Sequence, residues 1–97
     1  MNMTWYSAKL LFESEVDGEN DQPLREESIR VLLSESEAEA RAKAAEVGTE
    51  AEHEYLNEQG QKVRWRFVAV LEVQDLCADA LTDGMEVFSV LFRTPPN

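Results

Sequence analysis

The sequence predicts an α+β fold in which a five-stranded, mostly antiparallel sheet carries one alanine-rich helix on one face. Three observations predict it. Apolar residues alternate with polar ones in residues 5–14 and 63–73, which is typical of strands with one buried face. Residues 38–47 are rich in alanine and follow a helix-capping sequence. Turn-forming sequences separate these segments and give the order β-β-α-β-β-β in a single domain, residues 1–97.

The first two strands are predicted at residues 5–14 and 27–34, with a polar loop at 17–23 between them. Alternation indicates which side chains of these strands face inward: Tyr6, Ala8, Leu10 and Phe12 in the first, and Ile29, Val31 and Leu33 in the second. We expect the two strands to form an antiparallel hairpin with a long acidic loop.

The predicted helix follows the second strand. Ser36 can cap its first turn, and Glu39 stands three residues later, which is the capping-box spacing. Gly48 is the predicted C-terminal cap, because glycine readily adopts the left-handed conformation that ends many helices. Small alanine side chains over a wide arc let a helix lie close to a sheet, so we expect this helix to cover the core face.

A second hairpin is predicted around the loop Glu58-Gln59-Gly60, whose glycine suits the left-handed position of a three-residue connection. Residues 52–57 would then form a strand, although they could instead extend the helix. The hairpin predicts four cross-strand pairs: Tyr55 with Val63, His53 with Trp65, Glu54 with Arg64, and Glu52 with Arg66. Apolar and oppositely charged partners both match in this register, and a shift of one residue would lose both.

The long strand at residues 63–73 is the centre of the predicted sheet. Its odd-numbered residues are all apolar and are predicted to face inward: Val63, Trp65, Phe67, Ala69, Leu71 and Val73. Residues 75–81 are predicted as a short helical turn or a loop. Asp83-Gly84 is a turn signal, and residues 85–92 are the predicted last strand.

One helix cannot cover both faces of such a sheet, so apolar side chains should project from the other face. The candidates for this exposed patch are Leu11, Leu32, Val68, Val70, Val87 and Leu91. An apolar patch of this kind usually marks an interface. We expect a homodimer or a partner-binding sheet face, unless the order of the strands hides the patch.

The chain is strongly acidic, with 20 acidic against 9 basic residues and a net charge of −11. Such a charge repels phosphates, so we predict no binding to nucleic acid or to anionic membranes. Arg64 and Arg66 do not change this prediction. Alternation puts Trp65 on the opposite face of the strand, where it cannot stack on bases beside the arginines. Cross-strand pairing with Glu52 and Glu54 explains the two basic side chains. The charge does suit a basic protein partner.

Candidate chemistry is sparse. Cys77 and His53 are the only cysteine and the only histidine, so a nucleophile–base pair would need both. Because both have apolar neighbours, we expect them to be packing residues instead. The acidic run 13–21 could bind calcium, but its glycine is misplaced for an EF-hand loop. A zinc site lacks ligands. We predict no catalytic, cofactor-binding or metal-binding residue.

The location of the protein is predicted from what the sequence lacks. A single cysteine fits a reducing compartment. The first residues do not form a signal peptide, and no apolar run is long enough for a membrane span. We therefore expect a cytoplasmic protein.

Three segments resemble a known family. They are Trp5-Tyr6-Ser7-Ala8-Lys9-Leu10, then Asn57-Glu58-Gln59-Gly60 with Val63-Arg64-Trp65-Arg66-Phe67, and finally Asp83-Gly84-Met85-Glu86-Val87-Phe88-Ser89. In these segments the chain resembles the domain-of-unknown-function 4288 family of short bacterial proteins, and the likeness spans nearly the whole chain. The resemblance implies one compact domain, and it implies no established activity, cofactor or catalytic residue.

The sequence therefore favours a small acidic, non-enzymatic protein-interaction domain that forms a homodimer or binds a basic protein. Inhibition of a basic toxin is one form that such binding could take. The alternative is a small-molecule or metal-binding module, or an enzyme, with a pocket near Cys77. A titratable group within hydrogen-bond reach of Cys77 in a pocket would favour chemistry, and a flat apolar face would favour association.

Overall fold

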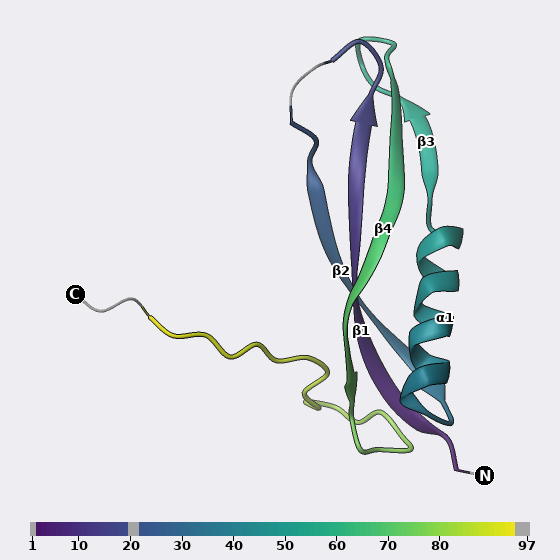
Figure 1. Cartoon of the computed structure of the whole chain (residues 1–97), viewed down its shortest axis with the longest axis vertical. Coiled ribbons are helices and arrows are strands. Elements are labelled where there is room, and N and C mark those ends of the chain that lie inside the picture. The colour runs from purple at the N-terminus through teal and green to yellow at the C-terminus, as the bar shows by residue number, and fades with distance from the viewer. Residues whose placement is uncertain (1, 20–21, 95–97) are drawn as a thin grey trace.

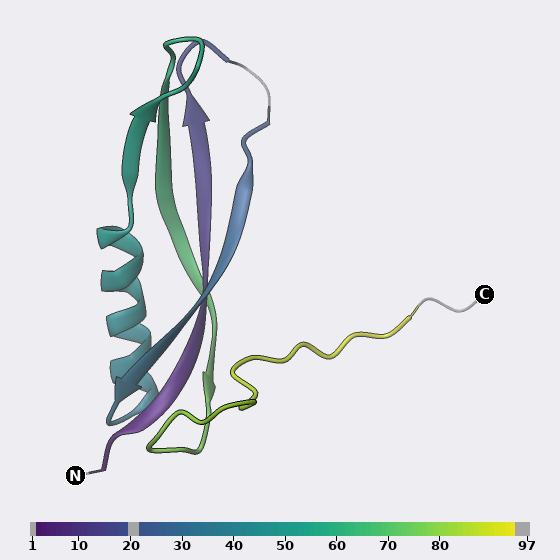
Figure 2. The ribbon, with the colours of Figure 1, turned by 180° about the vertical axis from the view of Figure 1, so that it is seen from behind.

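The computed structural model describes residues 2–19 and 22–94, and it has the predicted α+β architecture. Four strands form one antiparallel sheet in the order β2-β1-β4-β3, and a single helix lies along one side of it (Figures 1 and 2). In chain order the elements are β1 (Thr4–Val16), β2 (Arg25–Ser34), α1 (Glu37–Glu50), β3 (His53–Leu56) and β4 (Lys62–Asp75).

The predicted fifth strand, residues 85–92, is wrong. This segment is not part of the sheet, and its last residues run away from the body of the protein (Figure 1). Alternation indicates that one side of a segment can be buried. To join a sheet, the segment must also meet the edge of a strand that is free to pair with it. Strand β4, which precedes this segment in the chain, already pairs with β1 on one side and with β3 on the other, and α1 packs against it. Residues 76–81, predicted as a helical turn or a loop, are a loop.

The core lies between α1 and the sheet, and the predicted inward face of β1 is confirmed. The buried cluster consists of Tyr6, Ala8, Leu10 and Phe12 of β1 with Leu32, Ala40, Ala44 and Val73. Ala40 and Ala44 are fully buried, so the small helical side chains do bring α1 close to the strands. Burial raises the pKa of Tyr6, and the neighbouring carboxylates of Asp75 and Glu37 raise it further.

The predicted inward face of β2 is wrong. Leu32 is buried in the core at 7% exposure, whereas Ile29 and Val31 are 46% and 38% exposed. The hairpin register explains the difference, because Tyr6 pairs with Leu32 and Ala8 with Arg30. Directly opposite residues share a face of the sheet, so the even-numbered residues of β2 lie with the even-numbered core residues of β1.

Strand β4 contains two irregularities that change which of its residues face the core. The pairing with β1 runs Lys9–Glu72, Leu10–Val70, Leu11–Ala69 and Phe12–Phe67. Leu71 and Val68 are therefore extra residues, as in β-bulges, and each one reverses the alternation. Val70 packs against the core, so the predicted inward positions of Ala69 and Leu71 are wrong. The inward positions of Val63, Trp65, Phe67 and Val73 are confirmed.

Helix α1 begins as predicted and ends later. Ser36 is the N-cap, and its Oγ accepts a hydrogen bond from the backbone N–H of Glu39 at 3.2 Å. Gly48 is not the C-terminal cap, because the helix continues to Glu50. Gly48 is instead buried against Phe67: a methyl group added there would lie 2.7 Å from Cγ of that ring. The glycine is needed for close helix–sheet packing rather than for a turn.

The second hairpin has the predicted register. His53, Glu54 and Tyr55 pair with Trp65, Arg64 and Val63, respectively. Residues 53–56 are therefore a strand, not an extension of the helix. The predicted pairing of Glu52 with Arg66 is wrong, because Glu52 lies before β3 begins. Its Oε2 accepts a hydrogen bond from the backbone N–H of Phe67 at 2.9 Å.

Candidate interaction surface

The face of the sheet opposite α1, which we call the open face, is partly covered by the chain's own C-terminal segment. The side-chain amide of Gln74 holds Ser89: Nε2 donates to the Ser89 carbonyl at 2.9 Å, and the Ser89 N–H donates to Oε1 at 3.4 Å. The Lys9 ammonium lies 5.0 Å from the centre of the Phe88 ring, within cation–π range. Ser7, which pairs with Gln74 across the sheet, is fully buried. Phe88 and Ser89 thus lie where the sequence predicted bare sheet.

Beyond Ser89 the chain leaves the sheet. Residues 90–94, which we call the arm, extend away from every other element (Figures 1 and 2). Val90 is 57% exposed, Leu91 98% and Phe92 82%. Fully burying a leucine or phenylalanine side chain is worth about 1.5–3 kcal/mol, and the arm forgoes most of that in the isolated chain. These three consecutive apolar residues are thus left largely in water.

The six predicted interface residues do not form one patch. Leu32 belongs to the core and Val70 packs against it, so both lie on the helix-covered side. Leu11 and Val87 are partly buried. Val68, at a bulge, and Leu91, in the arm, are exposed.

Sequence reasoning missed several exposed apolar residues, among them Ile29, Val31, Val90 and Phe92. In β2, alternation at Ile29, Val31 and Leu33 favours the odd-numbered face for the core, so the sequence pattern indicates the wrong side. The register with β1 chooses it, because Lys9 pairs with Ile29 and Ser7 with Val31.

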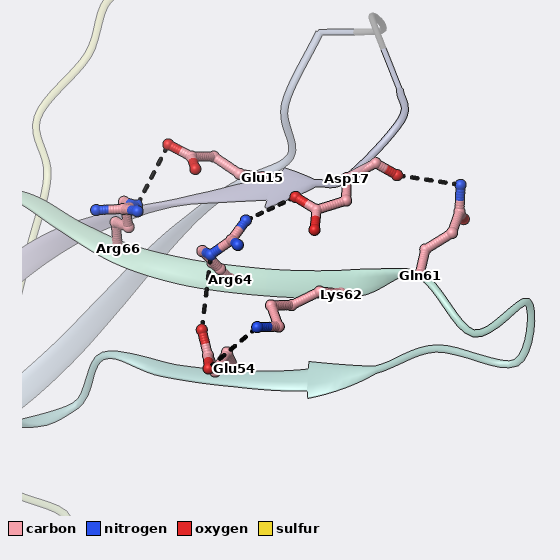
Figure 3. A network of polar contacts seen from close by, with 7 residues as sticks. All are labelled: Glu15, Asp17, Glu54, Gln61, Lys62, Arg64 and Arg66. Atoms are coloured by element: carbon pink, nitrogen blue, oxygen red, sulfur yellow. Dashed lines mark hydrogen bonds and ion pairs between the residues drawn. The ribbon is translucent and has the colours of Figure 1, made fainter.

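At the other end of the sheet, a network of ion pairs ties the tips of β1, β3 and β4 together (Figure 3). Arg64 is its centre: its Nη1 lies 2.7 Å from Asp17 Oδ1, and its Nε lies 3.6 Å from Glu54 Oε2. The hydrogen bond and charge of Asp17 raise the pKa of Arg64. Lys62 also contacts Glu54, and Arg66 contacts Glu15 at 3.3 Å. The basic side chains of β4 thus face carboxylates of their own chain.

The acidic loop that could have bound calcium contributes to this network. The Asp17 carboxylate contacts Arg64, and its carbonyl accepts a hydrogen bond from Gln61 at 3.3 Å (Figure 3). Residues 20 and 21 of the predicted loop lie outside the described residues. Across residues 2–19 and 22–94, no group of three or more His, Cys, Asp or Glu side chains is placed to hold a metal ion.

His53 and Cys77 lie at opposite ends of the sheet. His53 pairs with Trp65, while Cys77 follows Asp75, the last residue of β4. Ten strand residues separate these points, which is roughly 33 Å at the usual rise per residue. The two residues therefore cannot act as a nucleophile and its base.

Each of these two residues has only local polar contacts among those described. The His53 Nδ1 lies 3.0 Å from the Ala51 carbonyl, and its ring stacks on Tyr55. The Cys77 thiol is exposed and lies 3.9 Å from the Asp75 carbonyl. Asp79 lines the same open hollow as Cys77. Neither residue is set in an enclosed pocket with a partner that would activate it.

Comparison with known proteins gives one family. The model of a protein family described as a domain of unknown function, DUF4288, matches residues 5–89. The chain belongs to this family. No curated protein and no solved structure matches the chain significantly. In the described part of the chain, no helix has the length and apolar character needed to cross a membrane.

The segments that resemble DUF4288 have structural roles here. Trp5 accepts a hydrogen bond from Leu76 N–H at 3.0 Å and donates one to the Ala78 carbonyl at 2.8 Å, which anchors the chain after β4. In the second hairpin, the Asn57 Oδ1 accepts from the backbone N–H groups of Gln59 and Gln61. The DUF4288 match ends at Ser89, the residue that Gln74 holds, and the arm follows it.

Proposed function

We propose that this member of the DUF4288 family is a small acidic, non-enzymatic protein-interaction domain of the cytoplasm, and that the arm is part of its contact surface. The observation that carries the proposal is the exposure of Val90, Leu91 and Phe92. Contiguous exposed apolar side chains are typical of binding sites, because isolated soluble domains rarely leave them in water. Large apolar residues that become buried at the centre of an interface supply most of its binding energy.

Two partner classes suit the surface. A second copy of the chain would match apolar groups with apolar groups, as in a homodimer. A basic protein would be attracted by the net charge of −11, of which 15 acidic residues fall between Glu13 and Glu58. Added salt separates the two classes: it weakens attraction to a basic partner, and it screens the repulsion between two acidic copies. That nucleic acids and anionic membranes are not partners stays a prediction from the same charge.

The alternative, a ligand-binding module or enzyme near Cys77, has less support. The thiol is exposed, its sulfur contacts a backbone carbonyl, and His53 lies at the far end of the sheet. A reactive cysteine needs a neighbouring cation or base to stabilise the thiolate. The geometry around Cys77 favours association over chemistry.

The test is a pull-down of the tagged full chain from its native lysate at low and moderate salt, read by mass spectrometry. The comparison is between the natural chain, the double variant Leu91→Ser/Phe92→Ser and the control Leu24→Ser, which changes another exposed leucine outside the arm. We expect the natural chain and the control to capture the same specific partner, and the arm variant to lose it. Identical captures by all three proteins would contradict the proposal.

A further inference from the structure

Strand β2 is an outermost strand of the sheet, and one of its edges has no neighbouring strand. The backbone directions along this edge follow from two contacts. Ser14 N–H donates to the Leu24 carbonyl at 2.9 Å, so even-numbered residues turn their backbone groups toward β1. The Leu33 carbonyl instead accepts from Lys43 Nζ of α1 at 2.6 Å, away from β1. The N–H and C=O groups of Ile29 and Val31 therefore point out from the free edge.

This edge has little of the usual protection at Ile29 and Val31. Natural edge strands are commonly guarded by charges, prolines, bulges or covering elements. In β2 the charges Arg25, Glu26 and Glu27 gather at its start. Arg30, which pairs with Ala8, is one further charge and lies on the helix-covered side, whereas Ile29 and Val31 on either side of it are exposed on the open face. The pairing of β2 with β1 runs without a register shift, and it contains no proline. The outward backbone groups of Ile29 and Val31 are thus available to pair with another strand, up to Leu33, whose carbonyl is bonded to Lys43.

The arm has the properties of the missing strand. It follows Ser89, whose N–H and C=O are both held by Gln74, so the chain enters the arm already fixed in position. In an extended chain Val90 and Phe92 point to one side and Leu91 to the other. Arg93 follows the apolar run, while Glu26 and Glu27 precede the apolar half of β2. An antiparallel pairing of arm and β2 would therefore bring Arg93 toward these glutamates.

We propose that the arm adds to the free edge of β2 in a second copy of the chain, and that the second copy returns the same contact. This inference rests on the proposed function, in which the arm is a contact surface. A second copy is the fitting partner because one chain carries both the apolar strand and the apolar edge, so a two-fold arrangement satisfies both at once. Residues 87–93 have only one charged side chain, Arg93, so the contact adds no acidic group to a chain of net charge −11. The fifth strand predicted from the sequence then forms between chains, as in strand addition to a sheet edge.

The test uses complementary defects in the full chain. The arm variant is Leu91→Ser/Phe92→Ser, the edge variant is Val31→Lys, and the control is Leu56→Lys, an exposed leucine on the opposite edge strand β3. Molar mass is measured by sedimentation over a range of protein and salt concentrations. We expect the natural chain and the control to form dimers that strengthen with salt. Each defective variant should associate at least about tenfold more weakly, equivalent to about 1.4 kcal/mol.

Mixing the two defective variants gives the most specific result. The edge variant keeps the natural arm, and the arm variant keeps the natural β2 edge. We therefore expect a mixed dimer joined by one contact, between that arm and that edge. A chain that combines both defects should not join either of them. A mixture that stays monomeric while the natural chain dimerises, or an edge variant that dimerises as well as the natural chain, would overturn the inference. Circular dichroism shows whether Val31→Lys is folded, and Ile29→Lys replaces it if it is not.

The outcome also separates this inference from the proposed function. If the natural chain is monomeric at every concentration and salt, the second-copy inference is overturned. The proposed function still stands in that case, provided that the arm substitutions abolish capture of another protein from the lysate. If the arm substitutions change neither molar mass nor capture, both proposals fail.

Discussion

Replacing Leu10 with alanine should lower the free energy of unfolding by about 2–5 kcal/mol. Leu10 is fully buried near the middle of β1, between Ser28 on one neighbouring strand and Val70 on the other. Alanine would leave a cavity between the sheet and α1 that the surrounding strands cannot fill without distorting two ladders. For a domain of this size the loss is a large part of the total stability, which is typically about 5–15 kcal/mol.

The matched control is Leu11→Ala, one residue further along the same strand. Leu11 is only partly buried and lies on the open face, so its removal should cost clearly less. Urea unfolding followed by tryptophan fluorescence gives both values. Equal losses for the two variants would contradict the assignment of the core to the face of β1 that contacts α1.

The second large effect is expected at Gly48. An alanine methyl group there would lie 2.7 Å from Cγ of Phe67 and closer still to two other atoms of the ring, so helix and sheet must separate or the ring must move. Overpacking of this kind costs about 1–3 kcal/mol. The better helix propensity of alanine offsets up to about 1 kcal/mol of it. We therefore expect Gly48→Ala to be destabilising, in contrast to a glycine replaced in an open part of a helix.

Two further variants isolate the contact. Thr49→Ala, at the neighbouring exposed position of α1, should have little effect on unfolding by urea. In a chain with Phe67→Leu, the additional cost of Gly48→Ala should become smaller, because the smaller side chain relieves the overlap. A cost that is the same with phenylalanine and with leucine would show that Gly48 is required for another reason.

The features that could be predicted from the sequence are those fixed by local patterns. The inward face of β1 follows from strict alternation at Tyr6, Ala8, Leu10 and Phe12. The register of the second hairpin follows from its loop, since only one alignment matches apolar and ionic partners together. The Ser36 cap follows from the capping sequence.

The remaining features depend on contacts between distant segments. The face of β2 is set by its register with β1, which places Leu32 in the core although alternation favours Ile29, Val31 and Leu33. The bulges at Val68 and Leu71 have no distinctive residue to mark them, as valine and leucine are ordinary strand residues. The role of Gly48 depends on where the Phe67 ring lies.

The sequence predicted that apolar side chains are exposed, but for most of them it did not predict which residues these are. An exposed apolar surface was expected, and Val68 and Leu91 are exposed as expected. The apolar pattern of residues 85–92 predicted a strand, and a pattern cannot tell whether its partner lies in the same chain. The covering of the open face by residues 85–89 depends on the contact between Gln74 and Ser89, which the sequence does not signal.

Amide hydrogen exchange at Ile29 and Val31, measured residue by residue at low and high protein concentration, tests most directly whether the arm of a second copy pairs with the free edge of β2. These two N–H groups point out from the free edge of β2, whereas that of Leu32 faces β1 and serves as an internal reference. If the arm pairs with this edge, Ile29 and Val31 gain protection as concentration rises, and Leu91→Ser/Phe92→Ser abolishes the gain. Rapid exchange at both residues at every concentration, or the same protection in the arm variant, would contradict this pairing.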